Sequence, residues 1–290
     1  MKSTWSRALI AAGLLTVGGA AQAVQILGIT TDNRIATFDS ATPGVWSPLI
    51  SVTGVTPGAR IVGIDTRPGD SMVYGVGTDN KLYTIDPMTG AATFKVNLTG
   101  ATIESGLAYG IDFNPVADAG TGASLRLISS AGNNYAVNAN TGVIGNTSST
   151  IQPNIGGVAY TNSGVMPAPA STQLYYIDFA TDRLRVANGA FNAPSLIDVG
   201  PLGLDTIGAF GFDILADGRA FAGLTSGITG QSGFYSINLT TGAATLVGEF
   251  GAATPLLAGM TAVVPEAEAY ALMLAGLGLI GWQVRRQRQI

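Results

Sequence analysis

Apolar and polar positions alternate in short segments through the middle of this chain, and five of these segments end at an Asp or Asn. Four of the five also carry a tyrosine two positions before the apolar residue that precedes the Asp or Asn. A period of two puts alternate side chains on opposite faces of a strand, so the pattern predicts strands with one buried face. The apolar residues are Phe38, Ile85, Val137, Ile177 and Ile237, and the tyrosines are Tyr83, Tyr135, Tyr175 and Tyr235.

A turn of the form Asp/Asn-x-x-Thr follows each of these strands, and in three of them a glycine comes next, at Gly90, Gly142 and Gly242. Asp and Asn side chains hydrogen-bond to nearby backbone amides, and glycine adopts the positive φ that such turns require. Calcium ligation by these acids is the alternative, but each turn offers fewer oxygens than the roughly six to eight that calcium takes. We therefore expect hairpins in which the Asp or Asn caps the turn.

A second repeated element consists of Gly, an apolar residue and a third residue that is most often Asp, and it recurs every 47 to 54 residues. A repeat of about 48 residues is typical of one β-propeller blade, whereas a β-sandwich, the main alternative, gives no reason for a fivefold unit. The five copies are Gly63-Ile64-Asp65, Gly110-Ile111-Asp112, Gly157-Val158-Ala159, Gly211-Phe212-Asp213 and Gly259-Met260-Thr261.

The repeats predict an all-β, five-bladed propeller over residues 24–263. We expect four blades to begin at Ile61, Tyr109, Ile155 and Ala209. The fifth would combine the last strand, around residues 259–263, with the N-terminal strands of residues 24–46. Pairing the first and last strands closes the ring and leaves only short, protected sheet edges.

Both ends of the chain differ from the middle. At the N-terminus, Lys2 and Arg7 precede an apolar run, and the small residues Ala21 and Ala23 follow it, which is the layout of a signal peptide covering residues 1–23. At the C-terminus, Val264-Pro265-Glu266 precedes an apolar run of residues 269–284 and a basic end with Arg285, Arg286 and Arg288. The run approaches the ~20 residues that span a bilayer, and the arginines would stay on the cytoplasmic side. The sequence thus predicts an exported domain flanked by a signal helix and a C-terminal transmembrane helix.

The three C-terminal parts together resemble the PEP-CTERM sorting signal, which consists of a Pro-Glu motif, a membrane span and a basic end. The motif departs from the usual pattern at Ala267, where a second proline is common. The resemblance implies a Gram-negative bacterium that makes exopolysaccharide, and an exosortase that cuts near Val264-Pro265-Glu266. The implied partners are the Sec machinery and signal peptidase, the exosortase and the inner membrane, and the implied destination is the cell surface or extracellular matrix.

Composition excludes several kinds of chemistry. The chain has no Cys and no His, which removes disulfides, thiolate and imidazole metal sites and every nucleophile system that depends on histidine. Residues 24–263 hold nine basic and sixteen acidic side chains without a basic cluster, so we expect no binding to nucleic acid. Cations, neutral glycans and proteins are the expected partners, and no cofactor is expected. Arg67, Arg126, Arg183 and Arg185 are interpreted as turn and surface residues rather than as an anion site.

Asp65, Asp112 and Asp213 are the candidate functional residues, because the inner strand of each blade lines the central channel. One interpretation is structural, with the carboxylates accepting hydrogen bonds from turn amides of the neighbouring blade. A second is a cation site, and a third is catalysis by paired carboxylates, as in glycosidases. The equivalent positions in the other two units are Ala159 and Thr261, which favours the structural interpretation.

The domain also resembles an uncharacterised family, a domain of unknown function found in exported bacterial proteins. This resemblance supports the repeats and implies no activity. We expect a non-enzymatic, exported envelope or matrix protein with a binding or structural role linked to exopolysaccharide or biofilm. The alternatives are a carboxylate-dependent polysaccharide hydrolase and a protein-binding scaffold. The segments that carry the resemblance are residues 63–68, 82–87, 110–115, 159–162 and 234–245.

Overall fold

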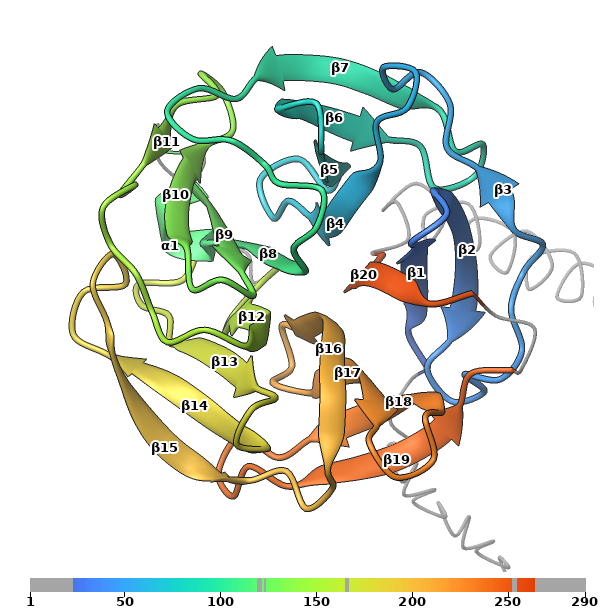
Figure 1. Cartoon of the computed structure of the whole chain (residues 1–290), viewed down its shortest axis with the longest axis vertical. Helices are drawn as coiled ribbons and strands as arrows, with labels where there is room; N and C mark the ends of the chain where they lie inside the picture. The colour runs from blue at the N-terminus through green and yellow to red at the C-terminus, as the bar shows by residue number, and fades with distance from the viewer. Residues whose placement is uncertain (1–22, 119–121, 123, 165–166, 252–254, 264–290) are drawn as a thin grey trace, which may run out of the picture.

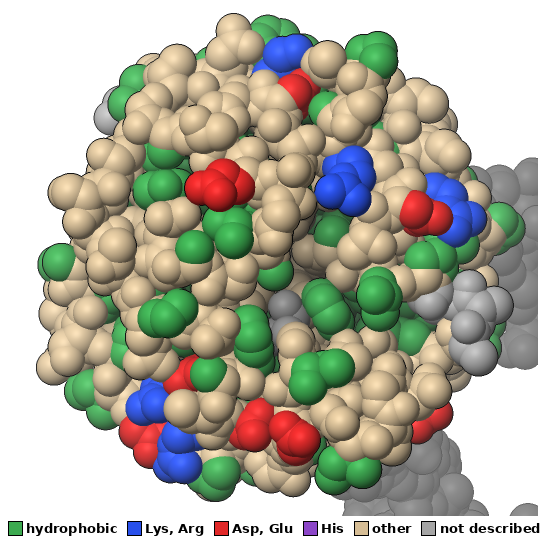
Figure 2. Space-filling view, viewed as in Figure 1, with side chains coloured by type: hydrophobic (Ala, Val, Ile, Leu, Met, Phe, Trp, Pro, Cys, Tyr) green, Lys and Arg blue, Asp and Glu red, His purple; other side chains and the backbone are tan. Residues whose placement is uncertain are grey.

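The computed structural model describes residues 23–263 except 119–121, 123, 165–166 and 252–254. Five four-stranded antiparallel sheets stand around a central axis as the blades of a propeller, which confirms the predicted fold (Figure 1). The face of the ring seen in Figure 2 is hollowed at its centre, with hydrophobic side chains around the hollow and charged side chains scattered outside it.

Each blade runs from an inner strand beside the axis to an outer strand at the rim. Blade 1 consists of β20 (Leu257–Ala262), β1 (Gln25–Thr30), β2 (Arg34–Asp39) and β3 (Ile50–Ser51). Blade 2 consists of β4 (Ile61–Thr66), β5 (Val73–Gly77), β6 (Lys81–Ile85) and β7 (Ala92–Asn97). Blade 3 consists of β8 (Tyr109–Phe113), β9 (Ser124–Ser129), β10 (Asn134–Asn138) and β11 (Ile144–Gly145), with the short helix α1 (Pro115–Asp118) between β8 and β9. Blade 4 consists of β12 (Ile155–Tyr160), β13 (Leu174–Asp178), β14 (Arg183–Asn188) and β15 (Ser195–Pro201), and blade 5 of β16 (Thr206–Ile214), β17 (Ala220–Ser226), β18 (Ser232–Ile237) and β19 (Ala244–Glu249).

The ring closes as predicted, through pairing of the C-terminal strand β20 with the N-terminal strand β1. Ile26 pairs with Ala262 and Ile29 with Gly259, so the last strand is the innermost strand of the first blade (Figure 1). An aromatic cluster reinforces this closure, since the ring of Phe38 lies 5.2 Å from that of Phe234 across the boundary between blades 1 and 5. The cluster continues to Trp46 and Phe250.

Three of the four predicted blade starts coincide with the first residue of an inner strand, at Ile61, Tyr109 and Ile155. The fourth was placed at Ala209, but β16 begins three residues earlier, at Thr206. This strand contains two register shifts, one between Thr206 and Gly208 and one between Phe210 and Phe212. The start was predicted from the position of Gly211 in the repeat, and β16 is longer than the other inner strands because its two bulges add residues at and before that glycine.

The predicted turn caps are present. Asp86 Oδ1 accepts hydrogen bonds from the amides of Met88 and Thr89, and Gly90 follows at φ 72°. Asn138 and Asn238 make the same pair of bonds, and Gly142 and Gly242 again have positive φ. These turns also join blades, because Thr53 of the preceding connection exchanges backbone hydrogen bonds with Gly90 and Ala92. Calcium is not needed to explain these acids.

One of the five strand copies occupies a different place in its blade. The strands of Ile85, Val137, Ile237 and Phe38 are the third in their blades, whereas that of Ile177 is β13, the second strand of blade 4. The turn after Asp178 therefore joins the second strand to the third. The sequence could not separate the two kinds of hairpin, because both begin with a period-two strand and an acid that caps the turn.

The repeated glycines of the inner strands allow these strands to approach one another around the axis. A Cβ atom on Gly157 would lie 2.8 Å from the Cβ of Phe212 in the next blade, and one on Gly259 would lie 3.2 Å from the Cα of Gly63. Larger residues would push the blades apart, so the glycine of the repeat fixes the width of the ring.

The signal peptide and the sorting signal lie outside the described residues, apart from Ala23, as do the two helices expected to flank the propeller. Among the residues that the structure describes, no helix has the length and apolar character needed to cross a membrane.

Candidate functional site: three carboxylates at the propeller axis

Asp65 of β4, Asp112 of β8 and Asp213 of β16 meet at the axis, and we call them the carboxylate trio. One carboxylate oxygen from each lies within 4.8 Å of the others. All three side chains are buried, and Asp112 is only 1 % exposed. The Gly-x-Asp repeat brings them together because it places each acid at the penultimate residue of an inner strand, in three different blades.

Each carboxylate of the trio accepts a hydrogen bond from a backbone amide of the following blade in chain order. The donor is always the residue after the equivalent position of that blade, so the bonds repeat the symmetry of the ring. Buried backbone N–H groups need such partners, and these bonds join inner strands that are not neighbours within a sheet. The donor and acceptor atoms are Phe113 N and Asp65 Oδ2 (2.7 Å), Tyr160 N and Asp112 Oδ1 (3.0 Å), and Ala262 N and Asp213 Oδ2 (2.7 Å).

The structural interpretation of these acids therefore holds in its main feature, hydrogen bonding to a neighbouring blade, although the amides belong to strands rather than turns. Thr261 takes the same role in blade 1, since its Oγ1 accepts a bond of 3.0 Å from Thr66 N. The hydroxyl in turn donates to Asp65 Oδ1 at 3.1 Å. Ala159 has no polar side chain, so its position in blade 4 cannot accept such a bond, and the amide of Thr206 in blade 5 instead donates to Asp182 Oδ1 at 2.8 Å.

The environment of the trio favours protonated carboxyl groups. Burial raises the pKa of Asp65, Asp112 and Asp213, because a charged carboxylate loses its hydration there. The charge of a neighbouring member of the trio raises the pKa of Asp65 and Asp112 further. The amide donors act in the opposite direction, but no Lys or Arg of the described chain forms an ion pair with the trio. Shared protons or a bound cation would relieve the repulsion among three such groups.

A cavity of about 520 Å³ opens beside the trio, where the inner strands end. Asp65, Asp213 and Thr261 contribute to its lining, and so do Val24 and Val263, the first and last residues of the propeller segment. The second oxygen of Asp112 accepts no hydrogen bond from the described part of the chain. The site thus offers carboxylate and hydroxyl oxygens to a small ligand, and it has room for one.

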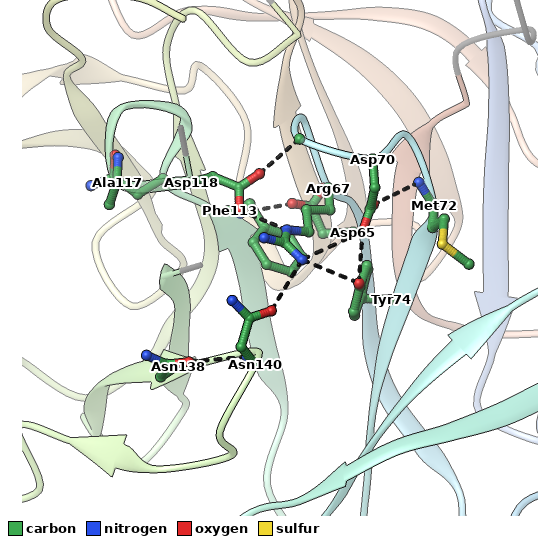
Figure 3. A network of polar contacts seen from close by, with 12 residues as sticks. Asp65, Arg67, Asp70, Met72, Tyr74, Phe113, Ala117, Asp118, Asn138 and Asn140 are labelled. Atoms are coloured by element: carbon green, nitrogen blue, oxygen red, sulfur yellow. Dashed lines mark hydrogen bonds and ion pairs between the residues drawn. The ribbon is translucent and has the colours of Figure 1, made fainter. Parts of the chain in front are cut away.

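Arg67 lies at the same cavity and is more buried than a surface residue, which corrects the prediction from sequence (Figure 3). Its Nε atom pairs with Asp118 Oδ1 at 2.6 Å, and the other oxygen of Asp118 accepts from Gly69 N at 2.7 Å. The guanidinium also lies 5.8 Å from the ring centre of Phe113. Arg67 therefore ties the connection after β4 of blade 2 to helix α1 of blade 3.

The other three arginines divide between two environments. Arg183 and Arg185 pair with Asp198 and Asp178 on blade 4. Arg183 is partly exposed, in agreement with the prediction, whereas the side chain of Arg185 is 18 % exposed and binds the buried Asp178. Arg126, however, is 2 % exposed, so its interpretation as a surface residue was wrong. It lies on β9 between Leu125 and Leu127, in a strand with both faces buried, and no repeat or charge pattern in the sequence indicates this.

The comparisons with known proteins place the chain in a family without an assigned activity. It belongs to the family described as "Domain of unknown function (DUF4394)", which matches residues 34–260. No curated protein matches the chain.

Two solved structures show similarity in fold. One is a protein of unknown function from Bacteroides caccae, with a TM-score of 0.41 and 13 % identity over 80 % of this chain and 74 % of that one. The other is a calcium-binding protein, regucalcin, from Agrobacterium tumefaciens, with a TM-score of 0.41 and 13 % identity over 76 % of this chain and 67 % of that one.

Proposed function

We propose that this protein is an exported, non-catalytic binding propeller of the cell envelope or extracellular matrix, and that the cavity beside the carboxylate trio is its binding site. The observation that carries the binding role is the meeting of three buried carboxylates, within 4.8 Å of one another, beside a cavity of about 520 Å³. Carboxylate pairs also serve hydrolases, but burial raises the pKa of all three acids here, whereas a glycosidase needs one ionised carboxylate beside a protonated one.

The ligand that fits the trio itself is a divalent cation such as calcium. Calcium takes oxygen ligands, and its charge offsets the mutual repulsion that raises the pKa of Asp65 and Asp112. If each carboxylate offers one oxygen and Thr261 its hydroxyl, the site supplies fewer ligands than calcium's usual six to eight or so, and the remaining positions would face the cavity. Hydroxyl or carboxylate groups of an extracellular polysaccharide are ligands of the right chemistry for those positions.

Calcium titration of the purified full chain tests the binding role. Isothermal titration calorimetry on the wild type is expected to show saturable binding, and Asp112→Asn is expected to weaken it at least tenfold. Asp217→Asn is the matched control, because Asp217 lines the same cavity with an exposed side chain outside the trio. Equal calcium affinity in the wild type and Asp112→Asn would remove the trio from the proposal.

The polysaccharide part of the proposal has a separate test. Pull-down with the exopolysaccharide of the producing cells, with and without a chelator, is expected to show binding that depends on calcium. Release of reducing ends from the same polysaccharide, lost in Asp112→Asn, would instead establish the hydrolase alternative.

The sorting part rests on Val264-Pro265-Glu266, the apolar run and the arginines that follow. The motif begins directly after Val263, whose amide donates a hydrogen bond of 3.0 Å to Gln25 O, so an exosortase would cut beside the closing strand. Mass spectrometry of the C-terminal peptide from native fractions tests this. An end near residues 264–267 that depends on the sorting enzyme is expected, and an intact end at Ile290 would contradict sorting.

A further inference from the structure

A second cavity, of about 240 Å³, opens at the other end of the propeller axis from the carboxylate trio, and we call it the Arg60 cavity. Residues at the starts of inner strands line it, among them Ile61 of β4, whereas the trio lies near the ends of such strands. Asp65 follows Ile61 by four positions on β4, which corresponds to ~13 Å. The Arg60 cavity and the cavity beside the trio share no lining residue, so they are separate sites.

The lining of the Arg60 cavity is apolar inside and polar at its opening. The polar side chains of Thr31, Arg60 and Ser105 are all exposed. In Figure 2 this face of the ring is toward the viewer, and hydrophobic side chains surround the hollow at its centre. An apolar interior that is open to water favours a ligand that covers it. The buried and half-buried residues of the lining are aliphatic or aromatic and include Ile61, Leu107, Tyr109, Phe210 and Leu257.

Arg60 is the one charged side chain among the described residues that line this cavity. Its Nη2 atom donates a hydrogen bond of 3.4 Å to the backbone oxygen of Ser105, across the opening of the cavity. No ion pair of the described part of the chain includes Arg60. Glu104 precedes Ser105 on the same loop, but it is exposed and does not line the cavity. The charge of Arg60 therefore remains available to an anion at the opening.

We propose that the Arg60 cavity binds an aliphatic carboxylate, with the carboxylate on the guanidinium of Arg60 and the chain inside the cavity. Arginine suits this ligand because its guanidinium donates two parallel N–H···O bonds to a carboxylate. At the ~30 Å³ that one water occupies, a cavity of about 240 Å³ holds about eight groups of that size, so a carboxylate with about six carbon atoms fits. A neutral ligand would leave the charge of Arg60 without a partner, and a small anion without a chain would leave the apolar walls in water.

Ligand-observed NMR with the purified full chain tests this site, and hexanoate is the probe. Hexanol has the same chain without the charge, and acetate has the charge without the chain. We expect a dissociation constant for hexanoate on the order of 1 mM, as is usual for ligands of so few atoms. Hexanol and acetate should each bind at least tenfold more weakly. Saturation transferred from the protein should be strongest at the terminal methyl group of hexanoate, because that end lies deepest in the cavity.

Two variants separate the charge from the cavity. Arg60→Gln is expected to weaken hexanoate binding at least tenfold and to leave hexanol binding unchanged, because only the carboxylate interacts with the charge. Ala108→Leu puts a larger side chain in the lining and should weaken the binding of both probes. Both positions are exposed, so both variants should fold.

Arg34→Gln is the matched control, because Arg34 does not line the cavity and already pairs with Asp32. It removes the same charge from the chain and should bind hexanoate as the wild type does. Equal affinity for hexanoate and hexanol would overturn the proposal, and so would hexanoate binding that neither Arg60→Gln nor Ala108→Leu changes. An equal loss in Arg34→Gln and Arg60→Gln would attribute the effect to net charge and would also contradict the site.

Discussion

Asp65 of blade 2 accepts a hydrogen bond of 2.7 Å from the backbone N–H of Phe113 in blade 3, so a carboxylate at the axis ties together two sheets that share no strand pairing. The bond gives the acid of the Gly-x-Asp repeat a structural role whether or not a cation binds. Because the bond needs only one acceptor oxygen, which an amide side chain also provides, an Asp→Asn substitution can remove the charge of a trio member and keep its hydrogen bond.

Asp112 allows this separation to be tested. Asp112→Asn retains an oxygen that can accept from Tyr160 N, whereas Asp112→Ala leaves that buried amide without a partner. We expect Ala to reduce the free energy of unfolding by ~1–3 kcal/mol relative to Asn. Urea denaturation without divalent cations measures the difference, and equal stabilities of the two variants would show that the amide bond contributes nothing.

The pH dependence of stability is the second prediction. The folded-state pKa of each trio carboxyl is raised above the ordinary value of 3.8, so the folded state holds more protons than the unfolded state above that pH. The stability that the protonated trio contributes is fully present below pH 3.8 and is lost as pH rises through the raised pKa values.

Urea titrations from pH 8 down to pH 5 in the presence of a chelator check this dependence. The wild type is expected to gain stability on acidification relative to Asp112→Asn, which has one titrating group fewer. Calcium above its dissociation constant should reduce the gain, because the cation competes with the protons. A difference between the two proteins that does not change with pH would contradict the raised pKa values.

The third prediction concerns the glycine of the repeat. Gly157→Ala would put a Cβ atom 2.8 Å from the Cβ of Phe212, where neither strand can move without widening the ring. Overpacking of this kind costs ~1–3 kcal/mol, and each kcal/mol lowers Tm by about 2–4 °C in a domain of this size. Gly106→Ala is the control, since no atom lies within 4 Å of the position of its Cβ. Calorimetry that found equal Tm values would show that inner-strand spacing is not tight.

The ring, its number of blades and its closure could be predicted because each follows from a local repeat. Asp86 and Gly90 indicate a turn by residue type alone, and Gly157, as the glycine of the repeat, marks a close approach of two inner strands. The trio could be proposed for the same reason, since Asp65 and Asp112 occupy equivalent positions in their repeats. The early start of β16 could not be predicted, because the repeat around Gly211 gives no sign that two bulges lengthen this strand.

Arg67 and Arg126 show the other limit of the sequence. Their environments are made by residues from different blades, as with Asp118 for Arg67 and Asn192 for Arg126. The sequence repeat cannot predict such a contact, because each of these arginines is found in one blade and has no equivalent in the others. Charge that is unique to one blade can therefore be placed only once the ring has been assembled.

The closing strand provides the last prediction. A chain that ends at Val263 keeps β20, whereas a chain that ends at Leu256 lacks it and leaves the inner edge of β1 unpaired. The shorter chain also loses Ala262 N, the donor to Asp213, and the buried side chains of Leu257 and Met260.

We expect the longer form to unfold cooperatively. We expect the shorter form to aggregate or to be degraded rapidly by protease, because an open sheet edge and an exposed core favour both outcomes. Limited proteolysis and circular dichroism of the two forms measure this, and equal resistance of both would mean that the five blades close without the innermost strand of the first blade. If the result is as expected, a cut within residues 264–267 would release the propeller intact, whereas a cut after Leu256 would destroy it.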